Sequence, residues 1–326
     1  MESLAAKIER TIQAAMPAGA SYILPEDIAL VIESLEAEDQ DIAIAYLNQA
    51  VLTAEPVSTS SDKWAVGWKE SLNMYKRTNN CETLAPLYSG KLPYIRLFRQ
   101  LYKTKTRATE EDTYKTLEHI LFSELYDSVI GSWITSHSSS SDGEYREPID
   151  IVEIGCGSCQ HIPRLNKKLS KEGRAVRFHS SDWSESSGLI CEELKAREGI
   201  DINFKQIDLL SDNLKEHSLP SGAYVYTVNA LEQLGNNSWK TIEWLISQSP
   251  RLVMHFEPVI EILEPSNALD RLSIDYINKR SYLSGLYGTI KTHEALERLS
   301  MLTCRRTFIA NAHHENNTFI CWVPTV

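Results

Sequence analysis

Apolar residues recur three or four positions apart along most of the first 135 residues, which is the spacing of an amphipathic helix. The repeat covers residues 4–15, begins again after Pro25, and also covers residues 38–52 and 110–133. Two acids follow Pro25, a composition typical of the first turn of a helix. The pattern therefore predicts an all-helical N-terminal part.

A further helix is predicted from a stripe of large apolar residues spaced i, i+4, i+8 and i+11. Its members are Trp64, Trp68, Leu72 and Tyr75. The polar residues 58–62 before it can cap its first turn. Two interpretations of the stripe stay open. It packs into a core, or it forms a lid whose aromatic face closes over a bound cofactor.

The pattern changes after residue 148, where short apolar runs alternate with amphipathic stretches. Strands are predicted at 149–154, 175–181, 202–207, 223–228 and 251–256, and helices at 160–172, 185–198 and 238–248. Strands separated by helices of this length predict a parallel sheet with helices on both faces.

A serine-rich segment separates the two patterns. Residues 136–147 are polar and of low complexity, a composition typical of flexible linkers. We therefore predict a helical lid or substrate domain at 1–135, a linker at 136–147 and an α/β domain at 148–326.

The overall charge excludes one class of partner. The chain of 326 residues carries a net charge of -11, whereas nucleic-acid binding requires clustered Lys and Arg. One local basic run is interpreted as the solvated face of a helix. It consists of Arg96, Arg99, Lys103, Lys105 and Arg107.

The sequence shows no apolar leader at its start and no apolar run of the roughly 20 residues that a membrane-spanning helix needs. Its six cysteines are scattered and do not form a disulfide framework. We expect a cytoplasmic protein that has no membrane partner, and a homodimer is compatible with the sequence.

Acids or amides stand at the ends of all five predicted strands, whereas a single acid at a strand end is common because it caps the next helix. In parallel sheets ligands bind at the carboxyl ends of the strands, so these residues mark a candidate site. They are Glu153, Asp182, Asp208, Asn229, Glu232 and Glu257.

The chemistry of these residues matches one kind of ligand. The carboxylate of Asp182 can accept both hydroxyls of a ribose, and Asp208, Leu209 and Trp183 offer an acceptor and apolar faces for an adenine. Glu153, beside a glycine turn, suits a positively charged amino-acid group. The ligand predicted has adenine, ribose and an aminocarboxylate, and no pyrophosphate.

These motifs resemble those of the class I S-adenosylmethionine-dependent methyltransferases. The acid-x-Gly-x-Gly motif is matched by Glu153, Gly155 and Gly157, and the acids after the second and third strands by Asp182 and Asp208. The segment 229–233 resembles the motif after the fourth strand, although Asn229 and Gln233 stand where the family often has histidine.

The resemblance implies a Rossmann-like, seven-stranded methyltransferase sheet that ends in an antiparallel pair, here 304–310 and 318–323. It implies S-adenosylmethionine as cofactor, and the N-terminal helices look similar to the substrate-capping domains of many small-molecule members. The cofactor residues implied are Glu153, Gly155, Cys156, Gly157, Asp182, Trp183, Asp208, Leu209 and Asn229.

Candidate bases are expected near the ends of the fourth and fifth strands. They are Glu232, His255 and Glu257, of which His255 has the best ordinary pKa for a base. Alternatively His255 is a hydrogen-bonded core histidine, Glu232 holds the cofactor or caps a helix, or all three bind a divalent cation, although no metal is part of the predicted site.

Two further basic groups lie near the end of the chain. Arg280 either reads an anionic acceptor or forms a surface salt bridge, and His313 and His314 are expected to be exposed in a polar turn.

The function predicted is O- or N-methylation of a small metabolite, sugar or peptide. Alternatives are an inactive subunit that binds S-adenosylmethionine, and a nicotinamide-dependent oxidoreductase. Gln160, at the third glycine position of the dinucleotide motif, disfavours the oxidoreductase.

A redox pair of Cys156 and Cys159 has suitable spacing, but would not require the acids at the strand ends. Aminopropyl transfer uses a similar sheet but would need an acidic polyamine site.

Overall fold

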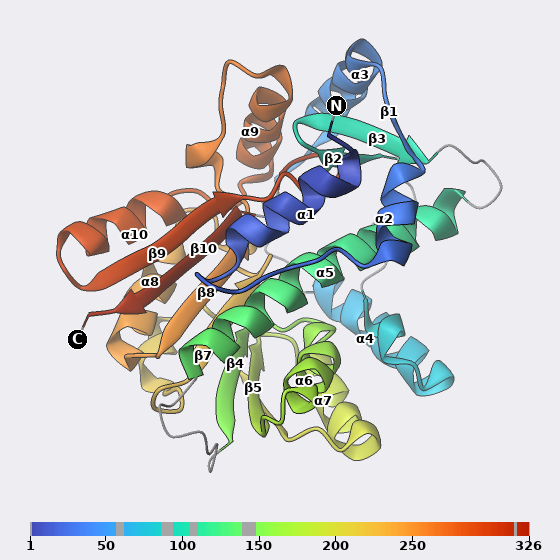
Figure 1. Ribbon diagram of the computed structural model, residues 1–326. Helices are drawn as coiled ribbons and strands as arrows, with labels where there is room; N and C mark the ends of the chain where they lie inside the picture. The colour runs from blue at the N-terminus through green and yellow to red at the C-terminus, as the bar shows by residue number, and fades with distance from the viewer. Residues whose placement is uncertain are drawn as a thin grey trace.

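The computed structural model describes residues 2–56, 62–85, 94–104, 110–138, 148–315 and 318–325. A seven-stranded sheet lies in the middle of the molecule with helices on both of its faces (Figure 1). No helix in these ranges is long and apolar enough to cross a membrane.

The large sheet contains the five parallel strands predicted from the sequence, each within one residue of its expected bounds. It also contains an antiparallel pair, whose first strand was expected at 304–310 and lies at 299–306. Its strands are β4 (Ile149–Ile154), β5 (Val176–Asp182), β6 (Ile202–Gln206), β7 (Tyr224–Val228), β8 (Leu252–Glu257), β9 (Leu299–Arg306) and β10 (Thr318–Pro324). The strand order is β6-β5-β4-β7-β8-β10-β9. Strands β4 to β8 are parallel, and β10 runs antiparallel to both β8 and β9.

The first three helices of this half follow the prediction closely, and two further helices and three short 3-10 helices were not predicted. In chain order the helices are α6 (His161–Lys171), α7 (Glu185–Glu198), α8 (Ser238–Gln248), α9 (Ala268–Arg280) and α10 (Leu286–Ala295), with short 3-10 helices η2 (Asp212–Glu216), η3 (Leu231–Leu234) and η4 (Ile260–Ile262).

The N-terminal half contains the predicted helices and, in addition, a small sheet. Its helices are α1 (Leu4–Ala15), α2 (Glu26–Glu33), α3 (Gln40–Thr53), α4 (Asp62–Thr78), η1 (Cys81–Leu84) and α5 (Glu110–Ser138). The small antiparallel sheet has the order β1-β3-β2, from β1 (Leu35–Ala37), β2 (Ile95–Leu97) and β3 (Gln100–Thr104). Strands of three to five residues show too little alternation to be recognised inside a helical pattern.

Alternate residues of each parallel strand face opposite sides of the sheet, and two hydrophobic clusters result. Ile151 of β4 packs with side chains of α5, α6, α7 and the N-terminal helices. Val152, the next residue, packs with side chains of α8 and α10. Glu153 therefore faces the α5 side of the sheet, and Ile154 faces the α8 side.

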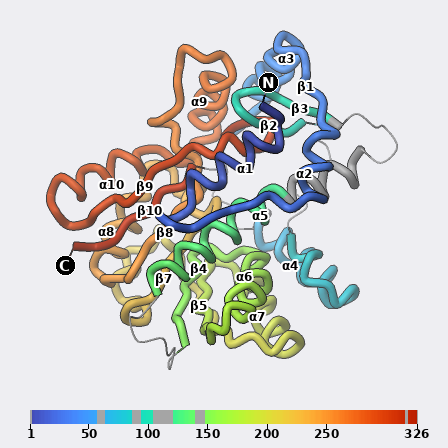
Figure 2. The backbone as a smooth tube through the Cα atoms, in the orientation of Figure 1, coloured from blue at the N-terminus to red at the C-terminus, as the bar shows by residue number. Residues whose placement is uncertain are grey.

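Elements from the first and last parts of the chain pack together, although the two termini themselves lie apart (Figure 2). Helix α1 contacts β9, and the backbones of Arg96 and Ala310 form an isolated antiparallel bridge.

The predicted linker lies outside the described residues, except for 136–138, which belong to α5.

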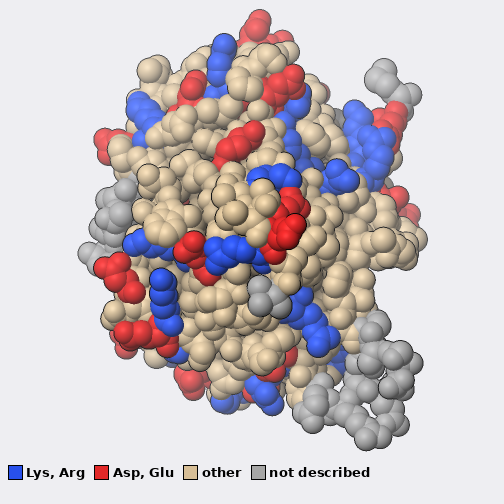
Figure 3. Space-filling view, turned by 90° about the vertical axis from the view of Figure 1, so that its left-hand side faces the viewer, with Lys and Arg blue, Asp and Glu red and all other residues tan. Residues whose placement is uncertain are grey.

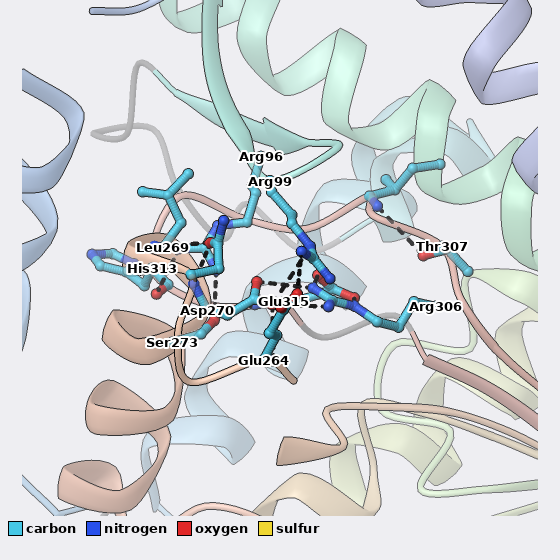
Figure 4. A network of polar contacts seen from close by, with 12 residues as sticks. Arg96, Arg99, Glu264, Leu269, Asp270, Ser273, Arg306, Thr307, His313 and Glu315 are labelled. Carbon is cyan, nitrogen blue, oxygen red and sulfur yellow. Dashed lines mark hydrogen bonds and ion pairs between the residues drawn. The ribbon is translucent and has the colours of Figure 1, made fainter. Parts of the chain in front are cut away.

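A buried ion-pair network joins the small sheet to α9 and to the segment between β9 and β10 (Figure 4). At its centre, the Arg306 guanidinium donates to both carboxylate oxygens of Asp270, at 2.8 and 2.9 Å, and to both of Glu315, at 2.8 and 2.6 Å. Burial alone would raise the pKa of Asp270, but the hydrogen bonds from Arg306 lower it.

The same network corrects the interpretation of the basic run. Arg96 is fully buried on β2 and donates to Ser273 Oγ at 2.6 Å, and burial lowers its pKa to about 10. Arg99 pairs with Glu264 at 2.5 Å, and Lys103 of β3 pairs with Glu38 at 3.0 Å. The run is therefore not a solvated helix face; Lys105 and Arg107 lie outside the described residues. On the face shown in Figure 3, basic and acidic side chains are interspersed.

Replacing Arg306 with alanine is expected to lower the free energy of unfolding by about 3–5 kcal/mol, because the buried Glu315 loses its ion-pair partner and Asp270 keeps, within the described chain, only Arg99, at 3.6 Å. The exposed pair of Lys240 and Asp212 gives the control, since Lys240→Ala should cost only about 0–1 kcal/mol. Urea unfolding followed by circular dichroism measures both values, and equal losses in the two variants would contradict the role of the network.

Candidate cofactor and acceptor site

A glycine turn at the end of β4 forms the centre of the site. Gly155 and Gly157 have φ values of +69° and +52°, which favour glycine. A Cβ atom on Gly155 would lie 2.4 Å from the Cβ of Ala230, so no other residue fits there without movement of the backbone. The N–H groups of Gly155 and Cys156 donate to Ser181 O, at 2.8 and 2.9 Å, and hold the turn against β5.

Asp182, at the end of β5, also holds the turn. One of its carboxylate oxygens accepts the N–H of Gly157 at 2.9 Å, and the other accepts the N–H of Ser184 at 2.8 Å. Burial raises the pKa of Asp182 and these two N–H groups oppose the rise. Sequence reasoning placed Asp182 beside the turn, but did not identify it as part of the turn's support.

Glu153 lies beneath the turn on the α5 side and is almost fully buried. Its Oε2 atom has no hydrogen-bond partner within the part of the chain that the structure describes, and neither has the hydroxyl of Tyr226. Burial raises the pKa of Glu153 well above its ordinary value. A buried carboxylate with an unused acceptor atom is costly to keep, so this position suits a ligand group that donates a hydrogen bond.

The residues predicted to hold an adenine come together at the ends of the neighbouring strands β5 and β6. Trp183 is half-buried, and its carbonyl accepts from Gln206 Nε2 at 2.7 Å. Asp208 is exposed and accepts the N–H of Leu210 at 2.9 Å. Leu209 packs at the edge of the α8-side cluster.

Helix α4 places Trp68 directly over the glycine turn. A Cβ atom on Gly157 would lie 2.8 Å from the indole of Trp68, which is buried and stacks on Trp64 with ring centroids 5.5 Å apart. Contacts between α4 and α7 fix this position, including Tyr75 OH donating to Glu198 Oε1 at 2.8 Å. The aromatic stripe is thus part of the core and also covers the turn.

Asn229 begins the segment after β7 in a left-handed conformation, with φ +50°. Its Nδ2 donates to Tyr126 OH at 3.4 Å, whereas its Oδ1 has no partner among the described residues. Tyr126 belongs to α5 and is buried. Nothing in the sequence distinguished it from the other apolar residues of that helix, because its contact with Asn229 spans 103 residues.

Two buried acids stand together beyond Asn229. Glu257, at the end of β8, accepts the N–H groups of Ala230 and Leu231 at 3.0 and 3.1 Å and so holds the start of η3. Burial raises the pKa of Glu257 to about 7. Burial and the neighbouring Glu257 raise the pKa of Glu232 to about 8. Glu232 and Glu257 therefore both have pKa values near neutral pH. Glu257 already accepts two backbone N–H groups, which leaves Glu232 as the candidate for proton exchange.

His255 does not fit the role of a base. It is fully buried; the indole N–H of Trp322 donates to its Nε2 at 3.0 Å, and its Nδ1 lies 2.9 Å from Thr227 Oγ1. Burial lowers its pKa to about 3. The structure therefore favours the alternative of a hydrogen-bonded core histidine, because both ring nitrogens are engaged. Among the described residues, Glu232, His255 and Glu257 do not form a group of converging metal ligands.

An aromatic wall lies near Glu232, formed by α9 and the segment before β10. The ring of Tyr276 stacks on His313 and on His314, with centroids 4.9 and 5.5 Å apart, and Tyr282 meets His314 edge-on. His314 is buried, so the expectation that this histidine is exposed was wrong.

Arg280 donates to Glu55 O and to Tyr282 OH rather than to an acid, which excludes a surface salt bridge to the described residues.

No protein-family model matches the chain, and no curated protein sequence matches it. Solved structures with similar shape include a SAM dependent methyltransferase from Aquifex aeolicus, at 10% identity and a TM-score of 0.38 over 60% of this chain and 89% of that one. They also include the DszA carbon methyltransferase, at 14% and 0.46 over 99% and 87%, and the pyocyanin biosynthetic protein PhzM, at 13% and 0.42 over 68% and 60%.

The fold is identified from the strand order, because the sequence identities are low. The central strand β4 carries the glycine turn, the parallel strands run outward from it on both sides, and the antiparallel β10 lies between β8 and β9. The chain therefore has the class I methyltransferase fold that its sequence motifs implied.

Proposed function

We propose that this protein is an S-adenosylmethionine-dependent methyltransferase that acts on an oxygen or nitrogen nucleophile of a small metabolite, sugar or peptide. The observation that carries the proposal is the pair of unused buried acceptors, Glu153 Oε2 and Asn229 Oδ1. Glu153 lies on β4 just before the glycine turn, and Asn229 directly follows the adjacent strand β7.

These residues fit the cofactor. Glu153 offers an acceptor for the amino group of its methionine part, and Asn229 offers a second acceptor nearby. Asp182 keeps the turn folded and retains lone pairs for the ribose hydroxyls. Trp183 and Leu209 offer apolar faces for the adenine, and Asp208 offers an acceptor. When bound, the cofactor supplies a methyl group on a sulfonium.

The acceptor side requires alignment and, for a protonated nucleophile, a base. Glu232 is the candidate base: with a pKa of about 8 it is largely protonated at neutral pH, and its ionised fraction, which grows as the pH rises towards 8, can accept the proton of the nucleophile. Glu257 acts on Glu232 through charge and through the start of η3, so it is a positioning residue. The helical half and the aromatic wall are proposed to exclude water and to select the acceptor.

The inactive-subunit and oxidoreductase alternatives gain no support from this geometry. An inactive subunit would have no use for the buried Glu232 next to the cofactor residues. A dinucleotide site would place a pyrophosphate at the turn, where Glu153 is a buried acid and Trp68 covers Gly157.

Asp182→Ala is expected to weaken binding of S-adenosylmethionine and of its demethylated product by about tenfold or more, because a charge-assisted hydrogen bond to the turn is worth about 1.5–3 kcal/mol. Isothermal titration calorimetry measures the affinity. Asp150→Ala is the matched control: Asp150 lies on β4 at its opposite end and pairs with His179 at 2.7 Å, so its loss should leave binding intact. Absence of binding to the wild type would refute the proposal.

Binding of the demethylated product is expected to change the tryptophan fluorescence of the protein, because Trp68 covers the turn. In Trp68→Phe this change should be smaller, because only Trp183 of the proposed cofactor site remains, whereas Trp239→Phe, at an exposed position on α8, should keep the full change. A fluorescence titration of the three proteins tests the placement of α4, and an undiminished change in Trp68→Phe would contradict it.

The raised pKa of Glu232 also predicts a pH dependence of stability. Between its ordinary value of 4.5 and about 8, the folded protein keeps the proton on Glu232 and the unfolded chain loses it. The stability contributed by Glu232 is therefore full below pH 4.5 and falls as the pH rises towards 8.

Glu232→Gln should reduce the fall in unfolding free energy between pH 5 and 8, because glutamine does not titrate. Urea unfolding at several pH values measures this, with Glu216→Gln on the exposed surface of η2 as the control. An identical pH profile in wild type and Glu232→Gln would argue against the buried, protonated state of this acid.

A further inference from the structure

Three cysteine side chains converge beneath the glycine turn. Cys156 lies within the turn, Cys159 follows it, and Cys191 comes from α7. Their sulfur atoms all lie within 4.8 Å of one another, and the sulfurs of Cys159 and Cys191 are 3.4 Å apart. The three side chains are 5%, 0% and 2% exposed. The backbone of Cys156 belongs to the glycine turn of the cofactor site, but none of the three thiol groups has a role in the proposed methyl transfer.

The local backbone directs these sulfurs inward. Cys159 has a φ of +57°, which is costly for a residue with a side chain, and its thiol approaches the carbonyl of Ser187 on α7 at 3.8 Å. The spacing Cys-x-x-Cys is that of a chelating pair in metal sites. In a trigonal site, metal–sulfur bonds of about 2.3 Å require sulfurs about 4 Å apart, which these positions allow with small side-chain movements.

The set of ligands selects the kind of metal. Three sulfurs form a soft donor set, which favours Cu(I) or zinc. Structural zinc almost always takes four ligands, and within the described ranges no fourth cysteine, histidine or acid joins the group. Cu(I) accepts three thiolates, and so it matches the number of ligands present.

We propose that Cys156, Cys159 and Cys191 form a binding site for Cu(I). On binding, the thiols release protons and three copper–sulfur bonds form, without a change of oxidation state. The ion then links the glycine turn to α7 and stabilises the folded protein. The thiols take no part in the proposed methyl transfer, although the site shares the glycine turn with the proposed cofactor site.

Anaerobic titration of the reduced protein with Cu(I), in competition with a coloured chelator, tests the site. We expect one ion per chain, a near-ultraviolet sulfur-to-copper absorption and a higher midpoint of thermal unfolding. X-ray absorption of the wild type should show three sulfur neighbours. X-ray absorption that shows two sulfurs in a linear arrangement would overturn the proposal, as would a titration in which the protein does not compete with the chelator. Both measurements use the wild type, so they do not depend on whether a variant folds.

The other three cysteines supply the control. Cys81, Cys304 and Cys321 lie outside the cluster, and Cys321 is as buried as its members. Cys191→Ser should weaken Cu(I) binding by about 100-fold, because one of three soft ligands is lost, whereas the triple variant Cys81→Ser, Cys304→Ser, Cys321→Ser should bind as the wild type does. Equal binding in Cys191→Ser would overturn the proposal. Calorimetry with S-adenosylmethionine on the same samples tests the methyltransferase proposal separately.

Discussion

The guanidinium of Arg306, held between two buried carboxylates, fixes the relation between three elements of the C-terminal half. Asp270 belongs to α9 and Glu315 to the segment before β10, and Arg306 ends β9. Since a buried charge without a partner is much more costly than a missing apolar contact, these three elements must come together in one arrangement. Arg96 extends the network to the small sheet through Ser273. The position of the aromatic wall follows, because Tyr276 and His314 lie on the elements that the network joins.

The candidate site differs from the apolar core because it buries acidic side chains. Apolar side chains fill both faces of the sheet, yet the strand ends bury Glu153, Glu232 and Glu257 and leave the Oε2 atoms of Glu153 and Glu257 without partners in the described chain. Burial without pairing lowers stability. Such a cost concentrated at one edge of a sheet is typical of a ligand site, whereas acids that only cap helices would remain at the surface.

The sequence predicted the parallel strands within one residue, because buried strands and amphipathic helices have different periods and each motif occupies a strand end. It placed Glu153, Asp182 and Glu232 in one region for the same reason. It did not predict the small sheet, the burial of Arg96 and His314, or the contact of Trp68 with Gly157. Each of these depends on partners far away in the sequence, such as the pairing of Arg96 with Ser273 over 177 positions. His255 was predicted to have the best pKa for a base, because the sequence did not reveal its hydrogen-bond partner Trp322 on the last strand.

The packing of the core and the placement of the site follow from a single register. Strand β4 alternates Ile151, Val152, Glu153 and Ile154 between the two faces of the sheet, and the first two already belong to different clusters. A shift by one residue would exchange the faces of all four. Glu153 would then lie on the α8 side, away from Tyr226, and Ile151 would leave the cluster under α5. The burial of apolar residues on both faces therefore places the acid beneath the turn, without any attraction between the acid and its surroundings.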